Sequence, residues 1–93
     1  MSYRLYYSNT SKNQIRTLHP WIKLLIKKHI EALREQPFLG KALERELTGF
    51  YSLRAKRFRV IYEINQPEKI IQIHYVGYRR DIYELFRKLI ADK

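Results

Sequence analysis

Two runs of alternating residues, separated by only two positions, constrain this chain more than any other feature. Apolar and polar side chains alternate over residues 51–55, and they alternate again over residues 58–64. A period of two is typical of strands that are buried on one face. The short gap predicts a β-hairpin, whose loop consists either of Lys56 and Arg57 or of the four residues 55–58.

Either loop places Arg54 directly opposite Arg59 on the two strands. Like charges that face each other across a strand pair destabilise a sheet. The only acidic residue near them in the surrounding sequence is Glu63. A polyanion held against this face would relieve the repulsion, so the hairpin gives the first indication of function.

The remaining elements are predicted from caps, prolines and periodicity. We expect a strand at 3–7, a helix before His19-Pro20, a helix from 20 to about 35, strands at 50–56, 58–65 and 69–76, and a helix over about 82–90. Ser8 and the polar residues after it can cap the first helix, and Pro20 suits the first turn of the second. Pro37 ends the second helix. The last helix carries apolar residues at helical spacing, and Asp81 can cap it.

This order, β-α-α-β-β-β-α, predicts an α+β fold in a single domain that spans residues 1–93. We expect an antiparallel sheet, in which the last three strands form a meander and the first strand lies at an edge. The helices are expected to pack on one face of the sheet and to leave the other face largely open, as antiparallel sheets tolerate. Arg54 and Arg59 would then lie on the open face or at its rim.

The chain is strongly basic throughout. It has 19 Lys and Arg residues against 9 Asp and Glu, a net charge of +10, and the excess is shared evenly by its two halves. Such a field favours nucleic acid, an acidic protein or an anionic membrane as partner. Cysteine is absent, which excludes disulfides and thiolate metal sites. Without a long apolar stretch or a signal-peptide pattern, we expect a cytoplasmic protein that does not associate with a membrane.

Several kinds of catalytic site are excluded by residue type. There is no glycine-rich phosphate loop and no cysteine nucleophile, and the acidic residues do not cluster as in a two-metal nuclease. The histidines His19, His29 and His74 fall on three different predicted elements, so we expect neither a metal site nor a cofactor.

Arginine, lysine and tyrosine remain as candidates. The end of the last strand should lie beside the hairpin, which would gather the following residues around one cleft: Arg54, Lys56, Arg57, Arg59, Arg79, Arg80 and Tyr83. Arginine stabilises charge on phosphate oxygens through bidentate hydrogen bonds. The neighbouring 2′-OH of RNA can attack the phosphorus, so metal-free cleavage is chemically possible. The competing interpretation is an ordinary solvated basic face, and composition favours neither.

Three segments within this region, residues 47–54, 58–62 and 76–83, resemble the RelE/ParE superfamily of bacterial toxin–antitoxin toxins. The resemblance covers nearly the full chain in the order of elements. It implies a compact microbial RNase-like (RelE-like) fold. It also implies a ribosome-dependent, metal-independent endoribonuclease that cleaves mRNA in the ribosomal A site and thereby inhibits translation.

The resemblance also implies roles for individual residues. Arg59 is similar to the family's phosphate-stabilising arginine, and Arg79 is similar to its second catalytic arginine. Tyr83 is similar to the aromatic residue that stacks on a substrate base or assists proton transfer. Arg54 and Lys56 match basic positions on the hairpin, which would bind RNA phosphates together with Arg57 and Arg80.

Two positions depart from the family pattern. Ser52 stands where the best-known branch has a lysine, and Tyr78 stands where many relatives have a histidine. The identity of the general base and acid is therefore open. Arginine is a poor base because its pKa exceeds 12, so Lys56 or Tyr83 is the better candidate if positive neighbours lower its pKa.

The resemblance implies several partners. They are a cognate antitoxin that silences the toxin, the ribosome with its rRNA and mRNA, and operator DNA that the toxin–antitoxin complex binds through the antitoxin. Two alternatives to the nuclease stay open: a non-enzymatic toxin of the ParE branch that inhibits DNA gyrase, and a degenerate basic domain that binds only antitoxin and DNA.

Overall fold

The computed structural model describes residues 2–78 and 82–91, which form a mixed five-stranded sheet with three α-helices. The elements in chain order are β1 (Arg4–Tyr7), α1 (Asn9–Arg16), α2 (Pro20–Ala32), a 3-10 turn η1 (Pro37–Leu39), β2 (Lys41–Ala42), a 3-10 turn η2 (Arg45–Leu47), β3 (Phe50–Ala55), β4 (Phe58–Asn65), β5 (Ile70–Tyr78) and α3 (Ile82–Ala91). The α+β class and the predicted order of the major elements are confirmed.

The hairpin of β3 and β4 has the shorter of the two predicted loops. Ala55 pairs with Phe58, so the turn consists of Lys56 and Arg57, and Lys56 adopts the left-handed region with φ 56°. Arg54 pairs with Arg59 in this register. The predicted juxtaposition of two arginines is therefore confirmed.

The sequence pattern predicted an antiparallel sheet, but the observed sheet is mixed. Its strand order is β1-β5-β4-β3-β2, and β1 runs parallel to β5 at one edge. The chain passes through α1, α2 and the hairpin strands before β5 reaches β1, so no tight turn forces the two strands to be antiparallel. The opposite edge carries β2, a two-residue strand that the sequence analysis did not predict. Such a strand is too short to show a period.

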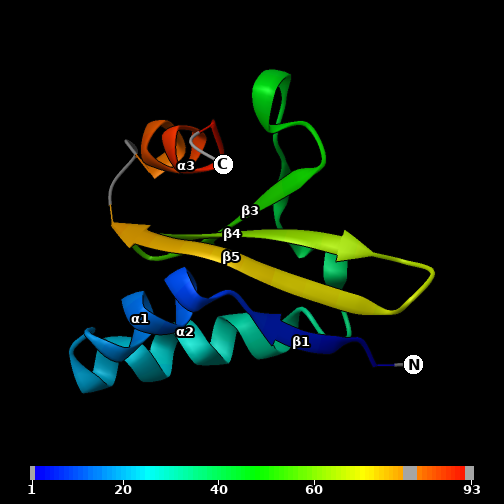
Figure 1. Ribbon diagram of the computed structural model, residues 1–93. Coiled ribbons are helices and arrows are strands. Elements are labelled where there is room, and N and C mark those ends of the chain that lie inside the picture. The colour runs from blue at the N-terminus through cyan, green and yellow to red at the C-terminus, as the bar shows by residue number, and fades with distance from the viewer. Residues whose placement is uncertain (1, 79–81, 92–93) are drawn as a thin grey trace.

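The expectation that all helices cover one face is also wrong. Figure 1 shows α1 and α2 beneath the sheet and α3 above it. The middle of β4 explains this arrangement, because Val60, Ile61 and Tyr62 are consecutive and all fully buried. Consecutive strand residues point to opposite faces, so both faces need a cover at this point. Ile61 packs in a cluster with Ile82 and Phe86 of α3.

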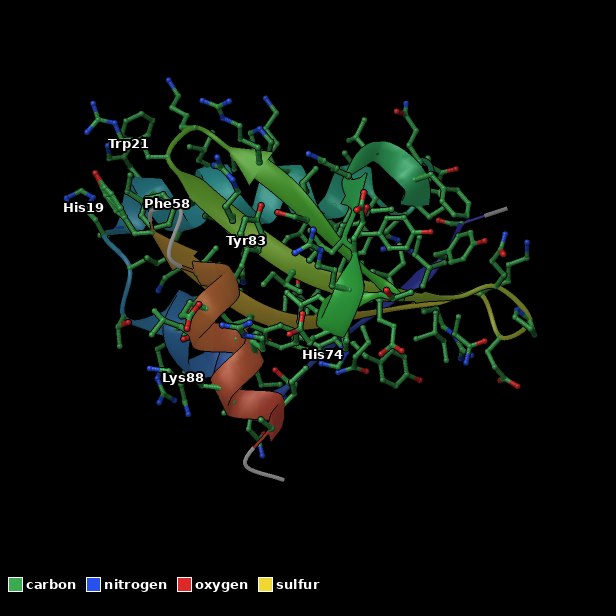
Figure 2. The ribbon with its side chains drawn as sticks, turned by 90° about the horizontal axis from the view of Figure 1, so that it is seen from above. His19, Trp21, Phe58, His74, Tyr83 and Lys88 are labelled. Carbon is green, nitrogen blue, oxygen red and sulfur yellow. The ribbon has the colours of Figure 1, made fainter. Side chains whose placement is uncertain are left out.

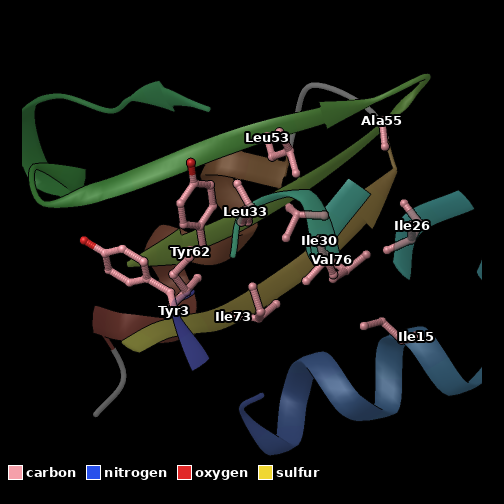
Figure 3. Packing of buried hydrophobic residues seen from close by; sticks show 12 residues of the cluster. Tyr3, Ile15, Ile26, Ile30, Leu33, Leu53, Ala55, Tyr62, Ile73 and Val76 are labelled. Carbon is pink, nitrogen blue, oxygen red and sulfur yellow. The ribbon is translucent and has the colours of Figure 1, made fainter. Parts of the chain in front are cut away.

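The larger core lies between the sheet and the helices α1 and α2. Figure 3 shows side chains from both layers meeting there, with Ile26, Ile30 and Leu33 opposite the strand residues. Leu33 directly follows α2, which ends at Ala32, three residues before the predicted end. Within the described parts of the chain, every helix is too short or too polar to cross a membrane.

A buried serine ties α1 to the sheet. The Ser8 hydroxyl oxygen caps the helix by accepting a hydrogen bond from the backbone N–H of Ser11 at 3.0 Å. The fully buried Ser11 hydroxyl in turn donates to the backbone carbonyl of Ile73 in β5 at 3.1 Å. The predicted Ser8 cap therefore positions α1 on the sheet as well as starting the helix.

Candidate functional site

The paired arginines lie on the face of the hairpin that is turned toward α3. Ser52, Arg54 and Arg59 share this face because residues two apart on β3, and residues paired across the hairpin, point the same way. These three side chains and Tyr83 line a pocket of about 550 Å³ at the edge of β3, which we call the arginine pocket. The described residues that line the pocket include no carboxylate. The pocket is therefore electropositive.

Neither arginine is neutralised within the described residues. The Arg59 Nη1 donates to the carbonyl of Phe58 at 3.4 Å, and the Arg54 Nε donates to the carbonyl of Lys56 at 3.3 Å. Glu63, the one nearby acid in the sequence, accepts a hydrogen bond from Nε2 of His74 at 2.9 Å instead. The two guanidinium groups thus keep donors for an anion that enters the pocket.

Tyr83 reaches the same pocket from the first turn of α3. Figure 2 shows it at the start of the helix, where α3 meets the hairpin strands. Its hydroxyl lies 2.9 Å from the Ser52 hydroxyl, and either oxygen can be the donor. Ser52 is only 6% exposed, so it holds the phenol from a fixed position. Ser52 stands where the best-known branch of the resembled family has a lysine. In this chain the serine has a structural role as the hydrogen-bond partner of Tyr83.

Besides Leu53 of β3, four residues from outside the hairpin that were not predicted as site residues complete the pocket wall: His29, Leu39, Gly40 and Lys41. They come from α2 and from the segment around η1 and β2, both far from the hairpin in sequence. Nδ1 of His29 donates to the backbone carbonyl of Leu25 at 2.9 Å. The one sequence feature that could have indicated this part of the pocket wall is Gly40, an isolated glycine between two predicted elements.

Gly40 is required by close packing. A Cβ at this position would lie 2.7 Å from the Tyr62 hydroxyl oxygen and 2.8 Å from the Ser52 carbonyl oxygen. The backbone N–H of Gly40 donates to the Tyr62 hydroxyl at 3.0 Å, and that hydroxyl donates to the Pro37 carbonyl at 2.7 Å. Tyr62 therefore fixes the segment that forms one side of the pocket.

The two predicted cations of the hairpin turn, Lys56 and Arg57, do not line this pocket. They line a separate pocket together with Trp21, Phe58 and Tyr78. Arg79 and Arg80 lie outside the described residues. The structure thus brings Arg54, Arg59 and Tyr83 together and places the turn cations elsewhere.

The histidines remain apart in the structure. His74 packs under α3 beside Phe50, with ring centroids 5.2 Å apart, while His29 borders the arginine pocket and His19 caps α2. Across residues 2–78 and 82–91, no group of three or more His, Asp or Glu side chains is placed to hold a metal ion. The arginine pocket offers hydrogen-bond donors and two hydroxyl groups, a combination suited to a phosphodiester.

Comparison with known proteins gives concordant matches. The family model of the ParE toxin of type II toxin–antitoxin systems matches residues 5–83. Toxin RelG of Mycobacterium tuberculosis is 31% identical over 85 residues, which span 89% of this chain and 98% of that protein.

Solved structures match as well. The toxin–antitoxin complex RelBE2 from M. tuberculosis superimposes with a TM-score of 0.79 at 27% identity, over 85% of this chain and 100% of that chain. A mutant of the E. coli toxin RelE in the free state superimposes with a TM-score of 0.77 at 19% identity, over 99% of this chain and 98% of that chain. The fold is therefore that of the RelE-like toxins, as the sequence resemblance implied.

Proposed function

This chain belongs to the ParE toxin family of type II toxin–antitoxin systems, within the RelE/ParE superfamily, and we propose that it acts as a ribosome-dependent endoribonuclease. In this proposal it cleaves mRNA in the ribosomal A site without a metal ion and thereby inhibits translation. The observation that carries the proposal is the pairing of Arg54 with Arg59 in a pocket that also holds the Tyr83 and Ser52 hydroxyl groups.

The chemistry follows from these groups. The 2′-OH of one nucleotide gives up its proton as its oxygen attacks the adjacent phosphorus and forms a cyclic phosphate. The bond from phosphorus to the 5′-oxygen of the next nucleotide breaks, and that oxygen takes up a proton as it leaves. Arg59, with Arg54 beside it, stabilises the negative charge that builds on the phosphate oxygens. Arg79 is proposed as a second stabilising donor, with Arg80 as a further RNA contact. In-line positioning of the 2′-OH supplies the rest of the rate.

Tyr83 is the proposed proton-transfer or base-stacking group. Its hydroxyl is hydrogen-bonded to Ser52, and both groups lie in the arginine pocket. Lys56, the other candidate base, lies in the separate pocket of the hairpin turn. This separation favours Tyr83 for proton transfer and leaves Lys56 for binding RNA.

One observation favours a second candidate function. The family model that matches the chain is that of the ParE toxins, so a non-nuclease toxin that inhibits DNA gyrase is the alternative. The described residues that line the arginine pocket include no carboxylate. This supports the nuclease, because inhibition by binding alone needs no such convergence of donors on one point.

We also propose a cognate antitoxin as partner. Similar structures are toxin–antitoxin complexes, among them RelBE2 of M. tuberculosis and RelBE of E. coli. With a net charge of +10, this toxin would attract an acidic antitoxin segment that covers the arginine pocket. The complex would bind operator DNA through the antitoxin, in the cytoplasm where ribosomes and mRNA are found.

The test uses purified toxin and ribosomes programmed with a defined mRNA. Wild-type protein should cut within the A-site codon, and Arg59→Ala should cut about 10²- to 10³-fold more slowly, as for other transition-state donors. Arg79→Ala should behave likewise, and Tyr83→Phe should also be slower. Arg4→Ala is the matched control, because Arg4 is exposed on the opposite edge strand. Folded Arg59→Ala that cuts at the wild-type rate would overturn the assignment.

A further inference from the structure

A second pocket, on the face of the hairpin turned toward α2, is lined by aromatic rings. Its volume is about 350 Å³, and Trp21, Phe58 and Tyr78 contribute rings to its wall together with Ile22 and Leu25. Trp21 is 60% exposed and Tyr78 is 41% exposed. Figure 2 shows Trp21 and Phe58 at the same corner of the molecule. Large aromatic surfaces are thus open to solvent on a small domain, which indicates a binding surface.

The rim of this aromatic pocket is basic. Lys56 and Arg57 of the hairpin turn line it, and both side chains are exposed. Within the described residues neither forms an ion pair with an acid. Arg57 donates from Nη1 to the Tyr78 hydroxyl at 3.3 Å, and the Tyr78 ring lies 5.1 Å from that of Phe58, centroid to centroid. Aromatic faces beside unpaired cations are the combination that binds single-stranded nucleic acid by stacking and charge.

The aromatic pocket adjoins the arginine pocket through the end of the hairpin. Arg59 pairs with Gly77, and the next register pair is Phe58 with Tyr78. Successive strand residues point to opposite faces, so the arginine and the aromatic ring are neighbours on the two sides of one strand. Lys56 and Arg57 stand at the turn between the two faces. A path of cations therefore leads from one pocket, over the hairpin end, to the other.

We propose that the aromatic pocket binds an unpaired base of the same RNA strand whose phosphate occupies the arginine pocket. The proposal rests on the proposed endoribonuclease function and adds a base-binding subsite to it. The strand would cross the hairpin turn, where Lys56 and Arg57 contact its phosphates, and would stack a neighbouring base against Trp21. Stacking needs no particular base, so the subsite adds affinity with little sequence preference.

Trp21 gives a direct readout, because it is the only tryptophan in the chain. Purified toxin is titrated with a short single-stranded DNA oligonucleotide, which lacks the 2′-OH and cannot be cleaved by the proposed chemistry. The matched probe is an abasic oligonucleotide with the same number of phosphates. The base-bearing strand should quench Trp21 fluorescence, and the abasic strand should not. Equal quenching by the two strands, or none by either, would overturn the proposal.

Variants test whether the ring supplies affinity. Trp21→Leu should weaken oligonucleotide binding about tenfold, measured by anisotropy of a labelled strand. Leu24→Ala is the control, because Leu24 is 71% exposed on the same helix and does not line the pocket. Wild-type affinity in folded Trp21→Leu would contradict the proposal. Quenching by an acidic peptide, with no response to the oligonucleotide, would contradict it as well and would assign the pocket to a protein partner.

The experiments distinguish failure of the proposed nuclease function from failure of the proposed base-binding subsite. Oligonucleotide binding is measured without ribosomes and without cleavage, so it can succeed even if no mRNA is cut. Conversely, suppose that the wild type and Trp21→Leu cleave mRNA on ribosomes at equal rates and with equal RNA affinity. That result would support the nuclease function and contradict the base-binding subsite.

Discussion

Tyr62→Phe removes a single oxygen atom that joins the pocket wall to the centre of the sheet. The Tyr62 hydroxyl accepts from the Gly40 N–H at 3.0 Å and donates to the Pro37 carbonyl at 2.7 Å. The ring is fully buried and stacks on Tyr51 at a centroid distance of 5.5 Å, and phenylalanine would keep both features. Two hydrogen bonds worth about 1 kcal/mol each are lost, so the free energy of unfolding should fall by about 2 kcal/mol.

The assay is equilibrium unfolding in urea. With a slope of roughly 1 to 2 kcal/mol per M for a domain of this size, the midpoint should fall by about 1 to 2 M, with the slope unchanged. Tyr6→Phe serves as the control, because Tyr6 is 47% exposed and its hydroxyl forms no hydrogen bond within the described residues. A Tyr62→Phe midpoint equal to that of Tyr6→Phe would refute the reasoning.

The same residue predicts a loss of stability in alkali. Burial raises the pKa of Tyr62 to about 12, whereas an unfolded chain releases this proton near pH 10. The contribution of the protonated Tyr62 phenol to the free energy of unfolding is fully present below pH 10. It is lost as the pH rises toward 12, because only the unfolded state deprotonates in that interval. The two-unit difference corresponds to about 2 to 3 kcal/mol. The wild type should therefore lose more stability than Tyr62→Phe between pH 10 and 12, and equal losses would mean that the buried phenol does not cause the alkaline destabilisation.

Three further predictions concern α3, metals and the partner. Phe86→Ala should lower the free energy of unfolding by about 3 to 4 kcal/mol, because Phe86 is 1% exposed and packs against the rings of Phe50 and Tyr75; a loss below about 1 kcal/mol in urea unfolding would mean that α3 is held elsewhere. Cleavage of mRNA should survive a chelator under conditions that keep ribosomes assembled, and loss of activity that one divalent ion restores would argue against the proposed chemistry. The association rate with the antitoxin should fall steeply between about 50 and 500 mM salt while the dissociation rate changes less, since steering acts on encounter; a constant association rate would point to apolar recognition instead.

The hairpin shows what the sequence pattern predicts well. Alternation over two short runs specified both strands, and the two-residue gap specified the register that brings Arg54 opposite Arg59. Both are local properties, because turn length and a period of two decide them within about fifteen residues. Caps and prolines were equally informative for α1 and α2, whose start signals lie within one turn of each helix.

Contacts between distant segments were not predictable in the same way. Alternation shows that a strand has a buried face, but it does not say which helix covers that face, so α3 was placed on the wrong side. The pocket wall contributed by His29, Gly40 and Lys41 depends on how α2 and the β2 segment pack beside β3. Glu63 is the acid nearest to the two arginines in the sequence, yet it pairs with His74, which lies eleven residues away in sequence on the neighbouring strand.

The arginine pocket is proposed to cut mRNA on the ribosome. The most direct measurement maps RNA 5′ ends by primer extension after brief induction of the wild type and of Arg59→Ala, with chromosomal DNA breaks scored in the same cultures. We expect new ends within translated codons for the wild type, none for Arg59→Ala, and intact DNA in both. Intact mRNA together with double-strand DNA breaks would contradict the claim and would identify the chain as an inhibitor of gyrase.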